Sequence, residues 1–121
     1  MATGFLNPQG VPIAPIEIAG QRLDAAIDTG FESGVQLPLS WFPVLNPPPK
    51  QEVRFLLPNG DIETTYTYSI RVGIDGDQFE TEAYFSPNEE VLIGLEAMRG
   101  YRLEINFVAG TVVLERVAPS P

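Results

Sequence analysis

The sequence of 121 residues contains no cysteine and no histidine. Without thiolate or imidazole, Ser-His-Asp and Cys-His nucleophilic catalysis are excluded, and so are zinc sites built from these ligands. Disulfide bonds are excluded as a source of stability. Lys50 is the only lysine and follows a run of prolines, so we do not expect a Ser-Lys catalytic pair. Any hydrolytic chemistry must therefore depend on carboxylates.

Positive charge and long apolar runs are also scarce. Seven Lys and Arg residues stand against sixteen Asp and Glu residues, for a formal net charge of −9 at pH 7. This balance argues against a nucleic-acid partner and suits a protein that acts on neutral, apolar or basic peptides. No apolar run approaches the ~20 residues of a membrane span. Residues 1–6 lack the basic head and the length of a signal peptide, so we expect a cytoplasmic protein without membrane association.

The residues that are present predict one mostly β domain over 1–121, with a core at about 12–117 and frayed termini. Short alternating segments are separated by Gly, Pro and Asn, which is typical of hairpins. Pro12 and Pro15 indicate that the first strand lies at an edge or is bent. We expect hairpins at residues 12–28, 52–68, 69–85 and 101–117, and short strands at 35–37 and 91–94.

Helix is expected at one place only, over Leu95–Arg99, with Gly100 ending it. Ser40 is expected to cap a single turn. Residues 43–49 contain four prolines and are expected to form neither helix nor inner strand. A stiff surface connection is favoured for them over a polyproline ligand for a partner's aromatic groove.

The tripeptide Asp28-Thr29-Gly30 is the strongest candidate for a functional site in the sequence. It directly follows the apolar residues Ala25–Ile27. A strand that brings Asp28 into the core requires its carboxylate to be hydrogen-bonded, paired or functional. Thr29 supplies a hydroxyl, and Gly30 allows a sharp turn or a close approach. From the residues alone, the pattern fits either a catalytic acid or an aspartate that caps its own turn.

Together with the segments that follow it, this tripeptide resembles the active-site signature of the retropepsin-like (clan AA) aspartic peptidases. The end of the chain is most similar to the bacterial and DNA-damage-inducible-type single-lobe members. Leu92-Ile93-Gly94 matches the apolar pair and glycine that lead into the helix of that family. Phe31 departs from it, because retroviral enzymes have alanine there and pepsin-like enzymes serine or threonine. The tip of the family's flap hairpin would be formed by Leu57, Pro58, Asn59, Gly60 and Asp61.

The resemblance implies a single-lobe, closed β-barrel with a flap hairpin and one short helix. It also implies an aspartic endopeptidase that works as a homodimer on polypeptide substrates, since this chain has a single Asp-Thr-Gly. Asp28 and its mate would share a proton and activate water, without metal or cofactor. Thr29 would brace the paired loops, Gly30 would allow their close approach, and Gly94 would let the next segment pass tightly behind them. Substrate would be bound by Phe31, by the flap tip, and by Leu92, Ile93 and Gly94.

The apolar character of the residues around the cleft favours hydrophobic side chains beside the cut bond. The strands at 101–107 and 111–117 are expected to supply much of the dimer interface, because their apolar faces need a cover. Two alternatives stay open: a catalytically silent module for dimerisation or peptide binding, and a glycosidase with Asp28 and Glu32 as its acid pair.

Overall fold

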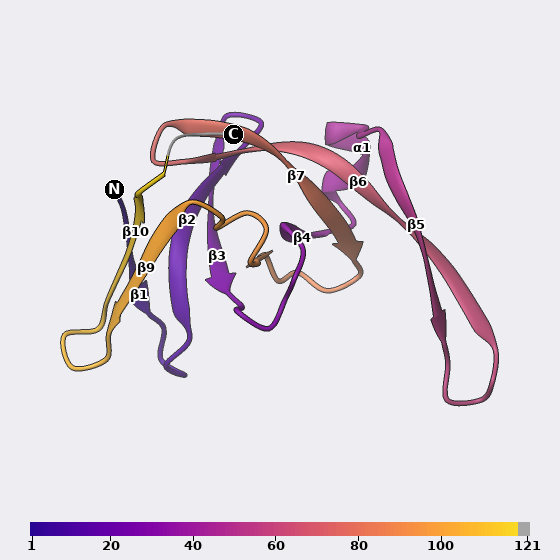
Figure 1. The fold of residues 1–121 in the computed structure, drawn as a ribbon, viewed down its shortest axis with the longest axis horizontal. Helices are drawn as coiled ribbons and strands as arrows, with labels where there is room; N and C mark the ends of the chain where they lie inside the picture. Colours follow the sequence, from indigo (N-terminus) through magenta and orange to yellow (C-terminus); the bar gives the residue numbers. More distant parts are fainter. Residues whose placement is uncertain (119–121) are drawn as a thin grey trace.

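The structure, a computed structural model, describes residues 1–118, which form ten strands and one short helix (Figure 1). Mostly β structure is therefore confirmed. The elements are β1 (Ala2–Leu6), β2 (Pro12–Ile18), β3 (Gln21–Ile27), β4 (Val35–Pro38), α1 (Trp41–Leu45), β5 (Pro49–Leu56), β6 (Ile62–Ile74), β7 (Asp77–Ser86), β8 (Leu92–Ile93), β9 (Tyr101–Asn106) and β10 (Thr111–Arg116). Within residues 1–118, the helical segment is far too short to cross a membrane.

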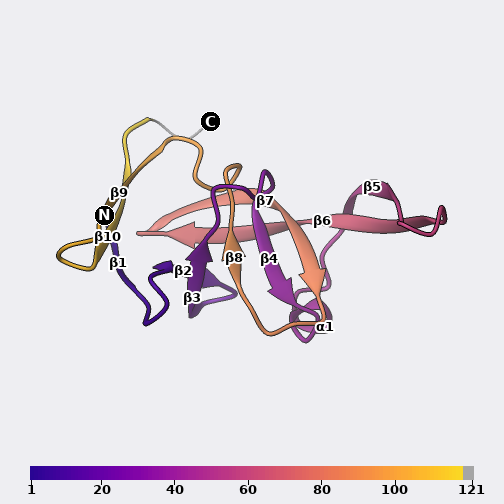
Figure 2. The ribbon, with the colours of Figure 1, turned by 90° about the horizontal axis from the view of Figure 1, so that it is seen from below.

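The strands form one sheet in the order β5-β6-β7-β4-β8-β3-β2-β1-β10-β9. In addition, β2 pairs with β6 through Glu17 and Gly73, which brings the sheet back on itself. Strands β6, β7, β4, β8, β3 and β2 thus form a ring, and β1, β10 and β9 continue from it (Figures 1 and 2). The closure that the sequence predicts is made by one residue pair and not by a full ladder.

Strand β2 is an inner strand, although its two prolines predicted an edge or a bend. It pairs with β3 along its length and with β1 at Pro12 and Ile13. On that second side the next pairing is Glu17 with Gly73 of β6. Pro15 lies between these two contacts, where the strand has no partner opposite β3. The missing N–H of a proline is tolerated at such a gap.

The hairpin formed by β5 and β6 extends away from the rest of the sheet (Figures 1 and 2). β6 runs without a break over 13 residues, so the two hairpins expected at 52–68 and 69–85 share one strand. Its outer half pairs only with β5, and its inner half pairs with β7. The outer half therefore forms an arm, and the inner half belongs to the core.

The helix is not where the sequence predicted it, and the expectation at Leu95–Arg99 is wrong. Residues 95–100 form consecutive turns. The Met98 N–H donates to the Gly94 carbonyl at 3.3 Å, but the Tyr101 N–H reaches back only three residues, to Met98. A helix requires a repeated i→i−4 ladder, which this segment lacks.

The helix is α1 instead, so the expectation that residues 43–49 contain no helix is wrong for their first three residues. Pro43 is the third residue of α1, in the first turn, where a backbone N–H has no partner inside the helix. Ser40 precedes the helix as expected, but its side chain makes no capping hydrogen bond. The prolines after it lead into β5, the edge strand of the sheet.

The N-terminus was expected to fray, but β1 is a strand that pairs with β10 and with β2. Of the tail that was expected to fray at the C-terminus, residues 119–121 lie outside the described residues. The core is built from the inward side chains of the ring and of β10. Its largest fully buried members include Ile16, Ile18, Leu37, Ile74, Ile93 and Leu114.

Candidate active site

Asp28 follows directly after β3 and is held there by β8. The two strands run parallel, and Ile27 pairs with Ile93. The Ala26 N–H donates to the carbonyl of Val91 at 2.8 Å, and the Asp28 N–H donates to the carbonyl of Ile93 at 3.0 Å. Because Ala25, Ala26 and Ile27 are all buried, the position of Asp28 is fixed by the core.

The side chain of Asp28 caps the turn that it begins. Its Oδ1 accepts a hydrogen bond from the Gly30 N–H at 3.0 Å, and its carbonyl accepts one from the Phe31 N–H at 3.1 Å. The carboxylate is half-buried and not buried as expected, while Thr29 and Gly30 are exposed. In a single chain, therefore, the tripeptide lies at the surface with its functional atoms accessible.

The loop after Asp28 is fastened to the segment that follows β8 by three backbone hydrogen bonds. Gly94 donates to Gly34 at 2.7 Å, Leu95 to Phe31 at 2.9 Å and Glu96 to Ser33 at 3.1 Å. The expected tight passage behind the loop is present in the single chain. A Cβ on Gly94 would lie 2.5 Å from the carbonyl oxygen of Phe31, which is closer than real Cβ atoms approach oxygen.

The other residues predicted to bind substrate fall into two groups. Ile93 is fully buried, so its side chain belongs to the core and only its carbonyl contributes to the site. Leu92 is half-buried, and it pairs with Ala26 and Gln36. Residues 57–61 form the tip of the β5–β6 hairpin and stand apart from the Asp28 loop (Figures 1 and 2).

The hairpin tip has the turn that its sequence predicts. Gly60 has φ +88°, a left-handed conformation that favours glycine. The Gly60 N–H donates to the Leu57 carbonyl at 2.9 Å, and Asn59 accepts from the Asp61 N–H at 3.0 Å. Leu56 and Ile62, which pair just before the tip, are 73% and 68% exposed. The arm thus ends in a hydrophilic turn preceded by uncovered apolar side chains.

Sequence reasoning missed Glu82 of β7, a carboxylate that is only 9% exposed. Its two oxygens accept hydrogen bonds from the hydroxyls of Ser33 at 2.6 Å and Thr67 at 3.0 Å. Ser33 belongs to the loop after Asp28, and Thr67 belongs to β6. Glu82 therefore connects the candidate catalytic loop with the strand that becomes the arm. Strand alternation gave no signal for this burial, because it places Glu82 on the same face as the exposed Glu80.

A pocket of about 430 Å³ opens beside this network. Its lining residues are Gly30, Phe31, Glu32, Ser33, Glu82 and Tyr84. The rings of Phe31 and Tyr84 meet edge to face, with centroids 5.9 Å apart. Burial, and then the negative charge of Glu82, raise the pKa of the Tyr84 hydroxyl above its ordinary value. Tyr84 is therefore a neutral hydroxyl throughout the range in which carboxylates ionise.

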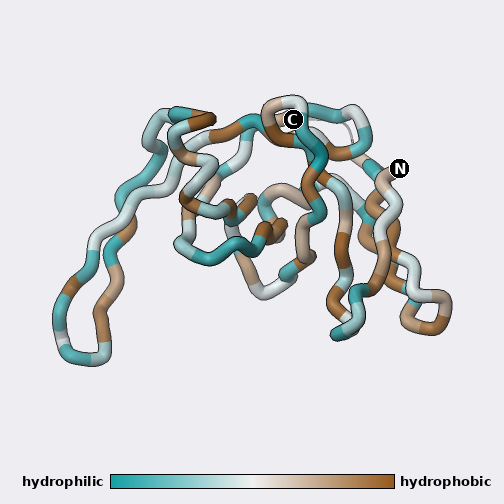
Figure 3. Tube along the Cα trace, turned by 180° about the vertical axis from the view of Figure 1, so that it is seen from behind, coloured by the Kyte–Doolittle hydropathy of each residue, from teal (hydrophilic) through white to brown (hydrophobic). Residues whose placement is uncertain are grey.

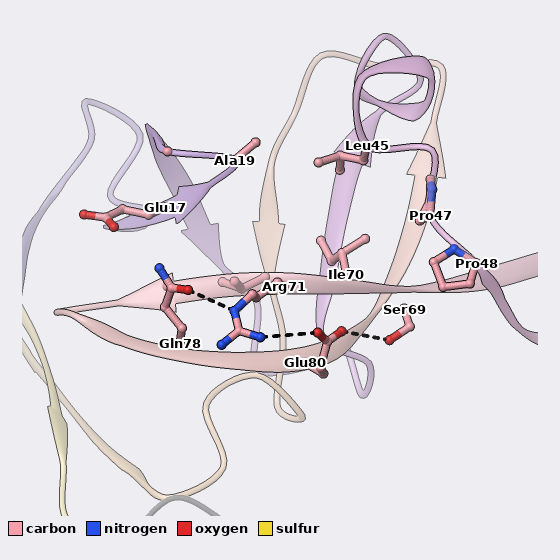
Figure 4. A pocket seen from close by; sticks show the side chains of 13 residues that line it. Glu17, Ala19, Leu45, Pro47, Pro48, Ser69, Ile70, Arg71, Gln78 and Glu80 are labelled. Atoms are coloured by element: carbon pink, nitrogen blue, oxygen red, sulfur yellow. Dashed lines mark hydrogen bonds and ion pairs between the residues drawn. The ribbon is translucent and has the colours of Figure 1, made fainter.

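A second pocket of about 430 Å³ contains none of the predicted site residues (Figure 4). It lies between the β2–β3 turn, the proline segment after α1, and β6. Its cation, Arg71, donates to Gln78 at 2.9 Å and lies 3.8 Å from Glu80, so its charge is satisfied within the chain. Glu32, the proposed partner of Asp28 in a glycosidase, is exposed and makes no hydrogen bond to Asp28 within residues 1–118.

No protein-family model matches the sequence, and no curated protein is significantly similar to it. Solved structures do resemble the fold. A retropepsin-like aspartic protease from Rickettsia conorii matches with a TM-score of 0.63 at 15% identity, over 93% of this chain and 86% of that one. The simian foamy virus (mac) protease matches with a TM-score of 0.58 at 22% identity, over 68% and 86% of the two chains.

A foamy viral protease-reverse transcriptase, solved in complex with an RNA/DNA hybrid, has a TM-score of 0.56 and 21% identity. The match covers 76% of this chain and 12% of that one. This chain therefore has the retropepsin-like fold, as the sequence predicted. The closer similarity to bacterial and DNA-damage-inducible-type members stays a prediction.

Proposed function

We propose that this chain is an aspartic endopeptidase that hydrolyses peptide bonds as a homodimer. Asp28 of each copy would contribute one carboxylate to the active site. The observation that supports this most is the placement of Asp28 on a retropepsin-like fold. Its backbone is fixed by β8, Thr29 and Gly30 beside it are exposed, and its Oδ2 accepts no hydrogen bond from residues 1–118.

The chemistry follows from two carboxylates at hydrogen-bonding distance. Such a pair does not ionise fully, so the two acids share one proton. The ionised acid takes a proton from water while the neutral acid donates to the oxygen of the scissile carbonyl. The hydroxide bonds to the carbonyl carbon and gives a tetrahedral diol. Collapse of this intermediate breaks the C–N bond: one acid gives its proton to the leaving amine, and a hydroxyl of the diol returns a proton to the other acid, so the pair is singly protonated again. Because the mechanism needs one ionised and one neutral acid, the pH profile of activity should be bell-shaped.

Fewer apolar residues of β9 and β10 are left uncovered in the single chain than the sequence predicted. The apolar faces of the last two strands were expected to need a cover, but Val112 and Leu114 are fully buried within the chain itself. The most exposed apolar residues are at the β9–β10 turn, where Phe107 is 70% and Val108 100% exposed, and Val117 after β10 is also exposed. This turn is hydrophobic, whereas the tip of the β5–β6 arm is hydrophilic (Figure 3).

The β9–β10 turn, the Asp28 loop and the arm tip all face the same edge of the molecule (Figure 1). A two-fold axis along that edge would bring two Asp28 loops together. It would also cover the hydrophobic turns, and the arms would close over the site from the other end. A substrate in extended conformation would then lie between the arms and the Asp28 loops.

The test is cleavage of a diverse peptide library by the native chain and by Asp28→Asn. Asparagine is nearly isosteric and keeps an oxygen to accept from the Gly30 N–H, so the turn should survive. We expect the native chain to cleave peptides, and the variant to lose at least about a thousandfold in kcat with an unchanged melting temperature. Substantial turnover by a folded Asp28→Asn chain would rule out the proposed pair.

One observation favours a second candidate, a catalytically silent peptide-binding or dimerisation module. Asp28 caps its own turn, and this structural role alone would account for an aspartate at the position. Peptides that bind to the native chain without being cleaved at any pH from 3.5 to 8 would favour this candidate.

A further inference from the structure

We propose that the pocket beside the Asp28 loop is a specificity subsite that accepts a lysine or arginine side chain of the peptide substrate, with Glu82 as its specificity-determining residue. The proposal rests on the proposed peptidase function, because it names the substrate class of that same site. It differs from the expectation that hydrophobic side chains are preferred beside the cut bond, which stays a prediction for the other positions.

The pocket is placed to receive a substrate side chain. Gly30, Phe31, Glu32 and Ser33 of its lining belong to the loop that begins at Asp28. The remaining lining comes from β7, which pairs with β4 on one side and with β6 on the other. A peptide extended past Asp28 would therefore place one of its side chains over this pocket.

The charge of the pocket is not neutralised within the chain. Glu82 is only 9% exposed, yet within residues 1–118 no Lys or Arg forms an ion pair with it or with Glu32. The two hydroxyls that bind Glu82 satisfy its hydrogen bonds but bring no positive charge. Carboxylates at this depth are normally paired with a cation.

Glu96, a neighbouring carboxylate, differs from Glu82 because it has a cation beside it. Glu96 accepts from the Thr81 hydroxyl at 3.1 Å and from the Glu82 N–H at 3.0 Å. Unlike Glu82, it also has a cation, because the Lys50 ammonium lies 3.8 Å from the same oxygen. Glu96 is thus neutralised within the chain, whereas Glu82 lines the pocket without a cation beside it.

The aromatic pair at the pocket is a second feature that favours a lysine or arginine side chain. Phe31 and Tyr84 present ring surface next to the two carboxylates. Cations are attracted to aromatic faces, and the aliphatic stem of Lys or Arg packs well on rings. An apolar substrate side chain would use the rings but would leave the Glu82 charge without a counter-ion. An acidic one would be repelled.

The first experiment measures kcat/KM of the native chain on peptides that differ only by lysine, arginine, norleucine or glutamate at each position around the cut bond. Norleucine matches the length of lysine without its charge. We expect one position at which lysine or arginine exceeds norleucine by about tenfold or more, with glutamate poorest. No preference for a basic residue at any position would overturn the proposal, and this comparison needs no variant that must fold.

The second experiment repeats the series with Glu82→Gln, which keeps the shape and an acceptor for a hydroxyl. We expect the ratio of kcat/KM between the lysine and norleucine peptides at that one position to fall to about one, whatever common change the altered contacts to Ser33 and Thr67 bring to both rates. Glu80→Gln, an exposed glutamate two residues earlier on β7, is the matched control and should keep the native profile. An equal fall of kcat/KM for lysine and norleucine peptides in Glu82→Gln would mean a structural role only.

Peptide binding to Asp28→Asn distinguishes a failure of the subsite from a failure of the peptidase function. Fluorescence anisotropy with labelled lysine and norleucine peptides reports the subsite even if no peptide is cleaved. A lysine preference that is lost in Asp28→Asn/Glu82→Gln supports the subsite whatever the fate of the peptidase proposal. Cleavage without such a preference overturns the subsite and leaves the peptidase proposal standing.

Discussion

Gly94 lies so close to Phe31 that a single methyl group at Gly94 would be 2.5 Å from the Phe31 carbonyl oxygen. This contact joins the segment after β8 to the loop that begins at Asp28. The partner is backbone and is itself hydrogen-bonded to the Leu95 N–H at 2.9 Å. It therefore has no freedom to move away, and the position requires glycine.

Gly94→Ala should for this reason destabilise the chain by about 2–3 kcal/mol and displace the Asp28 loop. Urea unfolding measures the first effect, and peptide cleavage measures the second. Gly73→Ala is the matched control, because it is a buried strand glycine whose added Cβ would meet the Glu17 side chain at 3.3 Å and the Asp77 carbonyl oxygen only at 3.8 Å, an ordinary contact distance. A Gly94→Ala chain as stable and as active as Gly73→Ala would show that the contact is loose.

The turn at the arm tip provides a second prediction. Gly60 and Gly76 lie in the turns at the two ends of β6, with φ +88° and +84°, and an added Cβ would meet nothing within 4 Å at either. Alanine at each should therefore cost a similar backbone strain, about 1 kcal/mol. If the arm closes over substrate, Gly60→Ala should reduce turnover severalfold and Gly76→Ala should not. Equal activity of the two variants, at equal melting temperature, would make the arm a structural hairpin.

The exposed β9–β10 turn provides a third prediction. Val108 is fully exposed, and its backbone N–H donates to the Asn106 side chain at 3.0 Å, so the turn does not depend on the valine side chain. Val108→Glu should leave the monomer folded but weaken the dimer at least tenfold, by placing like charges together at the two-fold axis. Sedimentation across micromolar concentrations measures this effect.

The matched control for the dimer is Val44→Glu, at an exposed valine of α1, far along the molecule from the β9–β10 turn (Figure 1). It should dimerise as the native chain does. If both variants dimerise equally well, the two-fold axis lies elsewhere. Truncation after Gly100 is unsuitable as a test, because it removes β10 and with it the buried Leu114.

The fourth prediction concerns alkaline stability and Tyr101. Arg116 donates to Asp77 at 2.9 Å and to the Tyr101 hydroxyl at 3.1 Å, and its guanidinium lies over the Tyr101 ring. Burial raises the pKa of Tyr101, and this outweighs the lowering by Arg116. The folded chain thus holds the phenol proton to a higher pH than the unfolded chain. The contribution of the protonated Tyr101 hydroxyl to the free energy of unfolding is fully present below about pH 10. It is lost as the pH rises through the pKa that Tyr101 has in the folded chain.

Tyr101→Phe should accordingly lower the free energy of unfolding by about 1 kcal/mol at pH 7, through its lost hydrogen bonds. It should also flatten the decline in stability above pH 10. Urea titrations from pH 7 to pH 11 measure both effects. Tyr66→Phe, at an exposed tyrosine of the arm, controls for the loss of a hydroxyl. A decline above pH 10 as steep in Tyr101→Phe as in the native chain would contradict the assignment.

The sequence by itself determined the hairpins and their turns. Gly20, Gly60, Gly76 and Gly110 all have left-handed φ at the turns where the pattern placed them. Both signals, the two-residue alternation and the conformational freedom of glycine, act within a few residues. The position of Asp28 at the end of a strand followed from the same local pattern, and with it the retropepsin-like fold.

Only the tertiary structure decided which groups around the site are buried and which hydrogen bonds they make. Leu95 and Glu96 donate their N–H groups to a loop about sixty residues earlier, which fixes where the segment begins. The segment then ends in turns, because the N–H groups of Arg99 and Tyr101 reach back only three residues, to Glu96 and Met98. Glu82 has the local pattern of an exposed residue, yet Ser33, 49 positions away, covers and binds it. Alternation specifies which side chains share a face, but burial depends on which distant segment lies on that face.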